Sequence, residues 1–200
     1  MSPAHKKTKQ AYHHGALKQG LVEAAAQLIK KNGHIGFNLR ELAKACSVSA
    51  PAVYRHFSSK NTLMVAIADA GFKNILSKFK NELPPKDSVS TKERLIRLGE
   101  IYIDFAVKNE GEFRVMFSRE LRQISEYKLI APLAEESFSF LKELICDILP
   151  LHDSKADQDN QVIGSWAIVH GLANLRIDGN LKDLSIEKFN TMVRSVLSFG

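Results

Sequence analysis

Apolar residues recur along this chain with the 3.6-residue period of an α-helix almost from end to end. Residues at i, i+3, i+4 and i+7 share one helix face, and sets with this spacing are separated by glycine, proline or clustered turn formers. No stretch shows the alternation of a half-buried β-strand. Nine helices are predicted, over about residues 15–31, 39–46, 50–57, 60–80, 91–108, 110–119, 124–149, 157–177 and 185–199. The pattern therefore predicts an all-α fold.

The second and third of these helices are short, and a turn of only three residues separates them. Asn38 stands where it can cap the second helix, and Ser49 where it can cap the third. Pro51 is compatible with a first helical turn, whose amides have no partner within the helix. Two short helices in this order, supported by a longer first helix, are typical of a helix-turn-helix.

The third helix is expected to divide its side chains between a buried side and an outer side. Val53 and Phe57, four residues apart, share the buried side, whereas Pro51 and Arg55 point outward. A helix in the major groove of DNA needs this division, because outward residues meet base edges and flanking residues meet phosphates. Arg55 is suited to the O6 and N7 atoms of a guanine. The residues predicted to contact DNA are Ser49, Ala50, Pro51, Ala52, Tyr54, Arg55, His56 and Lys60.

Positive charge is concentrated in the first two-fifths of the chain. Residues 1–82 hold 13 Lys and Arg against 4 Asp and Glu, a net charge of +9, whereas residues 83–200 have a net charge of −3. A basic N-terminal part favours a polyanionic partner, and a segment that only aids solubility is the alternative. The arm before the first helix is predicted to follow the DNA backbone or enter the minor groove through Lys6, Lys7 and Lys9.

Residues 37–63, FNLRELAKACSVSAPAVYRHFSSKNTL, resemble the DNA-binding segment of the tetracycline-repressor (TetR) family of bacterial regulators. The order of the helices predicted beyond this segment also fits the family. One departure is Ser47, where the family usually has glycine; a left-handed serine costs roughly 1 kcal/mol and does not prevent folding. The matching positions are Leu42, Ala43, Val48, Ser49, Val53, Tyr54, His56, Phe57, Lys60 and Leu63.

The resemblance implies an N-terminal three-helix, helix-turn-helix domain joined by a long helix to a C-terminal helical domain for dimerisation and ligand binding. The expected parts are a basic arm over residues 1–14, the DNA-binding domain over 15–60 and the C-terminal domain over 61–200. It further implies a dimeric repressor that binds double-stranded operator DNA and releases it when a small-molecule inducer binds. Arg40 is similar in position to a family residue that reaches a base or phosphate, and a solvated arginine is the alternative.

The segment GSWAIVHGLANL contains Trp166-x-x-x-His170-Gly171, which resembles one subgroup of the family, as does YHHGAL before the first helix. Small residues spaced along one helix face let another helix cross closely. In the family the last two helices of each subunit form the dimer interface, and packing of the same faces within one chain is the alternative. The residues predicted at this interface are Gly164, Ala167, Gly171, Leu184, Val193 and Leu197.

Aromatic residues of the central and C-terminal segments are candidates for an inducer pocket, because ligand sites are mostly apolar with a few polar anchors. An aromatic cluster at helical spacing is also typical of an ordinary core, and the inducer itself is not identified. The candidate residues are Tyr102, Phe105, Phe113, Arg114, Met116, Phe117, Trp166 and His170.

The sequence also bears on location and on enzyme chemistry. No apolar run approaches the ~18 residues of a membrane span, and no apolar segment follows the basic N-terminus as in a signal peptide. With only Cys46 and Cys146, these features predict a cytoplasmic protein with reduced thiols and no membrane partner. The sequence carries no recognisable phosphate loop, metal-ligand pair or nucleophile motif, so no cofactor, metal or catalytic residue is expected. A DNA-binding factor without an inducer and, less favoured, an α-helical enzyme remain as alternatives.

Overall fold

The computed structural model of this protein describes residues 7–148 and 155–198. These residues form helices and connecting turns and include no β-strand, which confirms the predicted all-α fold. No helix in the described part is long and apolar enough to cross a membrane. The elements are α1 (Lys7–Asn32), α2 (Leu39–Ala45), α3 (Ala50–Tyr54), α4 (Lys60–Glu82), α5 (Thr91–Lys108), α6 (Glu110–Met116), α7 (Arg119–Gln123), the 3₁₀ helix η1 (Ser125–Leu129), α8 (Ala131–Ile148), α9 (Lys155–Ile177) and α10 (Ile186–Ser198).

The first helix begins earlier than its apolar pattern predicts. The backbone is helical from Lys7, not from residue 15, so the expected arm contains a helical segment. No proline interrupts the intervening residues, and Gly15 within a helix costs only about 1 kcal/mol. The apolar pattern locates the face that packs, and a helix extends past that face until a stronger signal ends it.

The segment predicted to form two helices, over about residues 110–119 and 124–149, contains more and shorter elements. Ser118 caps the short helix α7 through its Oγ, which accepts a hydrogen bond from the Leu121 N–H at 3.1 Å. The 3₁₀ helix η1 follows, and α8 begins only at Ala131. Pro132 therefore lies in the first turn of α8 and starts this helix, since a missing N–H there removes no helical bond.

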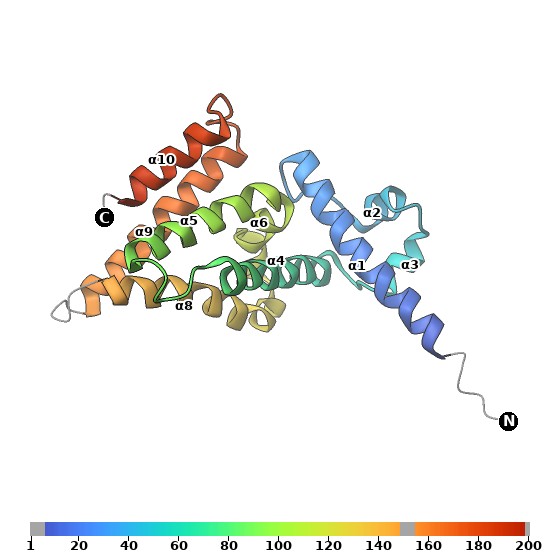
Figure 1. Ribbon diagram of the computed structural model, residues 1–200. Coiled ribbons are helices and arrows are strands. Elements are labelled where there is room, and N and C mark those ends of the chain that lie inside the picture. Colours follow the sequence, from blue (N-terminus) through green and yellow to red (C-terminus); the bar gives the residue numbers. More distant parts are fainter. Residues whose placement is uncertain (1–6, 149–154, 199–200) are drawn as a thin grey trace. The chain divides into compact units, whose positions relative to one another are not determined.

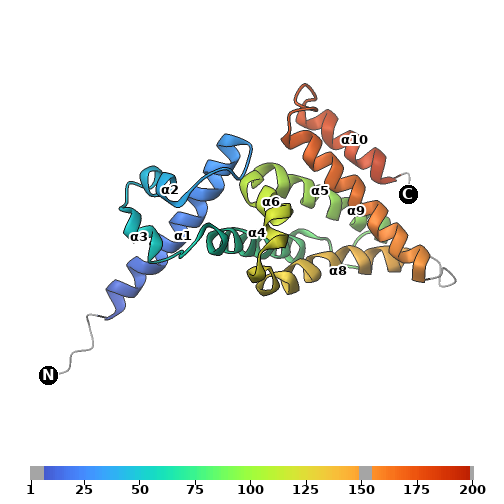
Figure 2. The same cartoon turned by 180° about the vertical axis from the view of Figure 1, so that it is seen from behind.

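The chain folds into two compact units, each formed from two stretches of the sequence. The first unit contains α1, α2, α3, α4 as far as Ala70, and the segment Gly111–Ile130. Figures 1 and 2 show α2 and α3 on the same side of α1. The side chains that are fully buried in this unit include Leu21, Ile29, Leu42, Val53, Leu63, Ile67 and Phe113.

Gly111 accounts for the place of α6 in the first unit. A Cβ atom at this position would lie 2.0 Å from the carbonyl oxygen of Ala26 and 2.6 Å from its carbonyl carbon. The backbones of α6 and α1 are therefore in direct contact, and only glycine fits between them.

The second unit contains Gly71–Glu110 with α8, α9 and α10. Helix α5 packs against all three of these helices and is central to the unit. At the α5–α10 contact, Arg194 donates to Glu93 Oε1 at 2.6 Å and to Glu100 Oε1 at 2.7 Å. The buried residues of this unit include Ile75, Ile101, Phe105, Leu144, Val169, Ala173 and Val193.

Replacement of Gly111 by alanine should destabilise the protein by about 2 kcal/mol or more, because the added methyl group meets backbone that cannot move aside as a side chain can. The matched control is Gly20→Ala in α1, where no atom lies within 4 Å of the new Cβ. That control should stabilise the helix by about 0.5–1 kcal/mol. Urea unfolding of both variants measures the difference, and equal stability of Gly111→Ala and the wild type would contradict the close contact.

Candidate nucleic-acid interface

Helix α2 starts at a complete capping box, which fixes the first half of the helix-turn-helix. Asn38 Oδ1 accepts hydrogen bonds from the backbone N–H groups of Arg40 and Glu41, both at 3.0 Å. The Glu41 carboxylate in turn accepts from the Asn38 N–H at 3.0 Å. Each side chain thus satisfies an amide that lacks a partner within the helix. The predicted cap at Asn38 is confirmed.

The turn between α2 and α3 is held by its backbone. Ser47 has φ 54°, a left-handed conformation, and its N–H donates to the Lys44 carbonyl at 3.1 Å. The Val48 N–H donates to the Ala43 carbonyl at 3.0 Å, which completes a Schellman ending for α2. Ser49 then caps α3, and its Oγ accepts from the Ala52 N–H at 3.3 Å. The chain therefore reverses within three residues, with both helix ends satisfied.

Helix α3 presents an inner and an outer side. Val53 is fully buried and Phe57 is 2% exposed, whereas Tyr54 is 48% exposed. Pro51 and Arg55 are also exposed. The helix ends at Tyr54, earlier than the predicted residue 57, because a tighter final turn leads out of it: the His56 N–H donates to the Val53 carbonyl at 2.9 Å.

Ala52, another residue predicted to contact DNA, is 9% exposed and follows Pro51, which is exposed. Of the other predicted contacts, Ser49 at the cap of α3 is exposed, Ala50 in α3 is half-buried, and His56, just after the helix, is half-buried.

The exposed charge on α2 and α3 is mainly positive. Arg40, Lys44 and Arg55 are all exposed, and Glu41, which is also exposed, has its carboxylate engaged in the capping box. Such a surface suits the phosphate backbone of a nucleic acid.

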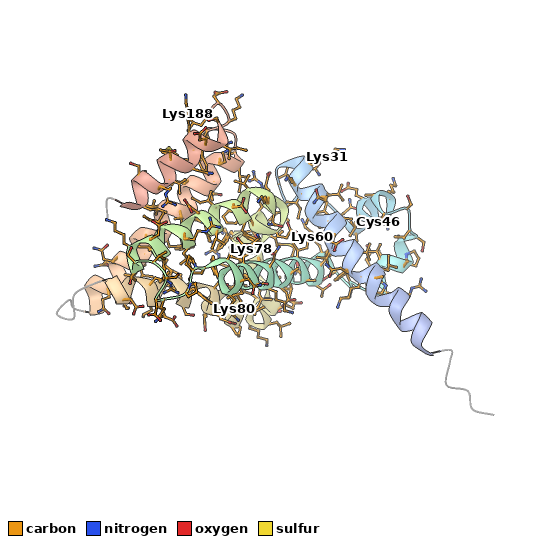
Figure 3. The ribbon with its side chains drawn as sticks, viewed as in Figure 1. Lys31, Cys46, Lys60, Lys78, Lys80 and Lys188 are labelled. Carbon is orange, nitrogen blue, oxygen red and sulfur yellow. The ribbon has the colours of Figure 1, made fainter. Side chains whose placement is uncertain are left out.

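Lys60, labelled in Figure 3, lies at the start of α4. Its Nζ donates to the Ile35 carbonyl oxygen at 2.5 Å and lies 5.4 Å from the centroid of the Phe37 ring. The ammonium group thus ties the loop before α2 to the start of α4. An ammonium carries three N–H donors, so this bond still leaves donors for a phosphate.

The three lysines predicted in the N-terminal arm are only partly covered. Lys6 lies outside the described residues, and Lys7 and Lys9 lie in the helical backbone at the start of α1.

The residues predicted to line an inducer pocket are divided between the two units. Phe113, Arg114, Met116 and Phe117 belong to the first unit, and the other four to the second. Within the first unit, Phe113 and Met116 are buried and the rings of Phe113 and Phe117 are 5.0 Å apart, as in an ordinary core. In the second unit Phe105 is fully buried. The burial of these apolar side chains is accounted for by packing in the core of each unit.

Three polar-tipped aromatic residues of the second unit do meet. The Trp166 Nε1–H lies 3.4 Å from the Tyr102 hydroxyl oxygen, which lies 2.9 Å from His170 Nδ1. Burial raises the pKa of Tyr102 far above its ordinary range, against a smaller lowering by the Trp166 bond. The phenol therefore keeps its proton, and it can donate to Nδ1 when that nitrogen is unprotonated. This hydrogen-bonded set connects α5 with α9.

The predicted dimer residues fall into two groups. On α9, Gly164 and Ala167 are exposed and Gly171 is half-exposed, and a Cβ atom added to either glycine would have no atom within 4 Å. On α10, Val193 is 2% and Leu197 is 8% exposed, so both belong to the core of their own chain. The prediction for these two is corrected, because the apolar face of α10 packs on α5. Leu184, between the two helices, is half-buried.

Two functional features were missed in the sequence. The hydrogen bond from the Asn38 N–H to the Glu41 carboxylate could have been predicted, because Asn38-x-x-Glu41 has the spacing of a capping box. The Lys60–Ile35 hydrogen bond could not have been predicted from the sequence, because the residues are 25 positions apart and one partner is a backbone carbonyl.

A capped helix-turn-helix with exposed cations, in an all-α chain, defines a DNA-binding protein of the regulator type. Residues 21–67 match the family described as bacterial regulatory proteins of the tetR family, and residues 95–197 match a tetracyclin repressor-like C-terminal domain. The chain belongs to the TetR family. It is therefore a DNA-binding transcriptional regulator and not an enzyme.

Curated relatives are similar over part of their length. The transcriptional activator FasR of Mycolicibacterium smegmatis is 27% identical over 100 residues, which are 50% of this chain and 45% of that protein. The nucleoid occlusion factor SlmA of Aliivibrio fischeri is 29% identical over 102 residues, 50% of this chain and 51% of that one. The chain thus spans about half the length of the curated relatives it matches.

Solved structures show the same fold over nearly the whole chain. A protein of unknown function from Rhodococcus sp. RHA1 has a TM-score of 0.73 at 20% identity and covers 100% of this chain and 98% of its own. AibR, solved with isovaleryl coenzyme A and operator DNA, has a TM-score of 0.69 at 18% identity, with 91% and 96% covered.

Replacement of Lys60 by methionine should lower the free energy of unfolding by about 1–2 kcal/mol, because the Ile35 carbonyl loses its donor in a partly buried site. Lys60→Arg keeps a donor and should lose less. The control is Lys78→Met, which removes an exposed pair with Glu82 of the same helix and should cost below about 0.5 kcal/mol. Urea unfolding compares the three, and a Lys60→Met variant as stable as the wild type would show that the tie contributes nothing.

Proposed function

We propose that this chain is a dimeric, cytoplasmic repressor that binds a palindromic operator through α3 and leaves it when a small molecule binds. The observation that carries the proposal is the division of α3 and the turn that follows it, with Val53 and Phe57 buried and Tyr54 and Arg55 exposed. Arg55 is proposed to read a guanine, while Tyr54, His56, Arg40 and Lys60 are proposed to contact phosphates.

Dimerisation is supported by an exposed apolar face on α9. Ile163, Ile168 and Leu175 are 56%, 40% and 43% exposed, although monomeric proteins seldom leave several large apolar residues of one helix in water. Gly164 and Gly171 lie along this face with open space above them, which leaves room for a crossing helix. A two-fold dimer would place two α3 helices on successive major grooves, about 34–36 Å apart.

The functional parts proposed for the chain are an arm over residues 1–14, a DNA-reading part over 15–60 and a dimerisation and ligand part over 61–200. The inducer proposal is supported by precedent, since AibR binds both an acyl coenzyme A and operator DNA with a similar fold. The Trp-x-x-x-His-Gly motif is proposed to mark a subgroup of the family. Its Trp166 and His170 form hydrogen bonds with Tyr102, and these bonds join α5 to α9.

The experiment that tests the function is selection of bound sequences from random duplex DNA at two salt concentrations, followed by transcription in vitro from a promoter that carries the selected site. The proposal expects an enriched palindrome and reduced transcription. Salt-sensitive binding without an enriched sequence would contradict specific recognition, and increased transcription would contradict repression.

Substitution of Arg55 by alanine should weaken binding to the selected site by about 1–3 kcal/mol and relax the preference at one base pair of each half-site. Lys188→Ala, which removes an exposed lysine on α10, is the control and should change neither quantity. Repeated selection with both variants measures the preference. An unchanged preference at every position in Arg55→Ala would remove Arg55 from base reading.

Substitution of Gly171 by leucine should convert the dimer into a folded monomer, because the new side chain has space within its own subunit and obstructs a crossing helix. Ile168→Glu should do the same by placing a charge on the apolar face. Leu129→Glu, at an exposed leucine in η1, is the control. Sedimentation equilibrium gives the mass, and a Gly171→Leu protein that stays dimeric would place the interface elsewhere.

A further inference from the structure

The second unit contains a groove of about 610 Å³ that the residues proposed so far do not line, apart from Val193. It lies between α5 and α10, which are in contact, and is bounded by the last residues of α4 and α9. Its volume is in the range of small-molecule sites, roughly 300–1,000 Å³. The groove is therefore large enough for a ligand and belongs to one compact unit.

The floor of the groove is apolar and its edge is not fully covered. Ile101, Ile103, Phe189 and Val193 line it and are at most 5% exposed. Ile186, also in the lining, is 72% exposed. An apolar body placed here would cover surface that water now contacts.

The charges around the groove cancel in pairs, with one exception. Arg97 and Arg194 pair with Glu100, and Arg194 also pairs with Glu93. Lys108 pairs with Asp104 at 2.8 Å. The remaining acidic lining residue, Glu82, pairs with Lys78 at 3.1 Å. Each charged residue of the lining other than Arg176 thus has an ion-pair partner, in the lining or beside it.

Arg176 forms no ion pair with a carboxylate of the described residues. Its Nη1 donates to the Leu184 carbonyl at 2.9 Å and also to the Leu181 carbonyl, and its Cζ lies 5.0 Å from the centroid of the Phe189 ring. Both bonds leave from Nη1, so the Nε and Nη2 N–H groups take no part in them. That edge of a guanidinium is the one that binds a carboxylate with two parallel hydrogen bonds.

We propose that this groove binds an amphipathic carboxylate, with its apolar body on the floor and its anionic head at Arg176. The carbonyl bonds and the Phe189 ring fix the guanidinium before the ligand arrives, which lowers the entropy lost on binding. This inference rests on the proposed function in one respect: the groove is taken as the site where the inducer of the regulator binds.

The test is isothermal titration of the full chain, without DNA, with octanoate and with octanamide, which has the same shape and no charge. We expect octanoate to bind the wild type at least tenfold more tightly than octanamide. Arg176→Gln should lose this preference, and Arg176→Lys should keep part of it. No binding of octanoate to the wild type, or equal binding of the two compounds, would overturn the proposal.

A second pair of variants keeps the test valid if Arg176→Gln unfolds through loss of the loop carbonyl bonds. Ile186→Glu and Ile186→Lys remove the same exposed apolar contact and differ only in charge at the groove. Octanoate should bind the lysine variant at least fivefold more tightly than the glutamate variant, and equal affinities would overturn the proposal. Operator binding is measured in a separate experiment. A protein that binds no operator would contradict the proposed regulator function, whereas the octanoate affinities alone test whether the groove binds a carboxylate.

Discussion

Burial of Val53 and Phe57 is the interaction on which the DNA-facing surface depends. Helices α2 and α3 have seven and five residues, far too few to be stable alone. They exist because apolar side chains on their inner sides are buried, each contributing about 1.5–3 kcal/mol, and because both starts are capped. Since Tyr54 and Arg55 follow Val53 directly, that burial also sets the direction in which they point.

The first unit links this surface to a segment distant in sequence. Gly111 brings α6 against the backbone of α1 at Ala26, and Gly111–Ile130 joins the DNA-binding helices in one packed body. A substitution in that segment therefore acts on the body that carries α3. Helix α4 contributes to both units, its first residues to one and Gly71 onward to the other.

The sequence predicted the helix-turn-helix well because its signals are local. The cap residues Asn38 and Ser49 and the left-handed Ser47 are each determined by neighbours within a few positions. Predictions that depended on which segment, distant in sequence, packs against a residue were less accurate. Periodicity shows that one face of α10 is apolar but not which helix covers it, so Val193 was assigned to a second subunit although it packs in its own.

The same limit applies to charge. The position of Arg176 near the end of α9 reads as an ordinary helix-end cation, and only the fold shows that nearby acids are paired with other bases. Likewise, Lys60 matched a phosphate-binding position, and its bond to the Ile35 carbonyl became visible only in three dimensions.

The central claim is that Arg55 reads a guanine in the major groove from each of two subunits. The most direct measurement replaces single guanines of the selected operator by 7-deazaguanine, which removes the N7 acceptor and keeps base pairing, and compares wild type with Arg55→Ala. We predict a loss of at least tenfold at one guanine in each half-site for the wild type, and no further loss for Arg55→Ala at those positions. Equal sensitivity of both proteins, or none at any guanine, would contradict this claim.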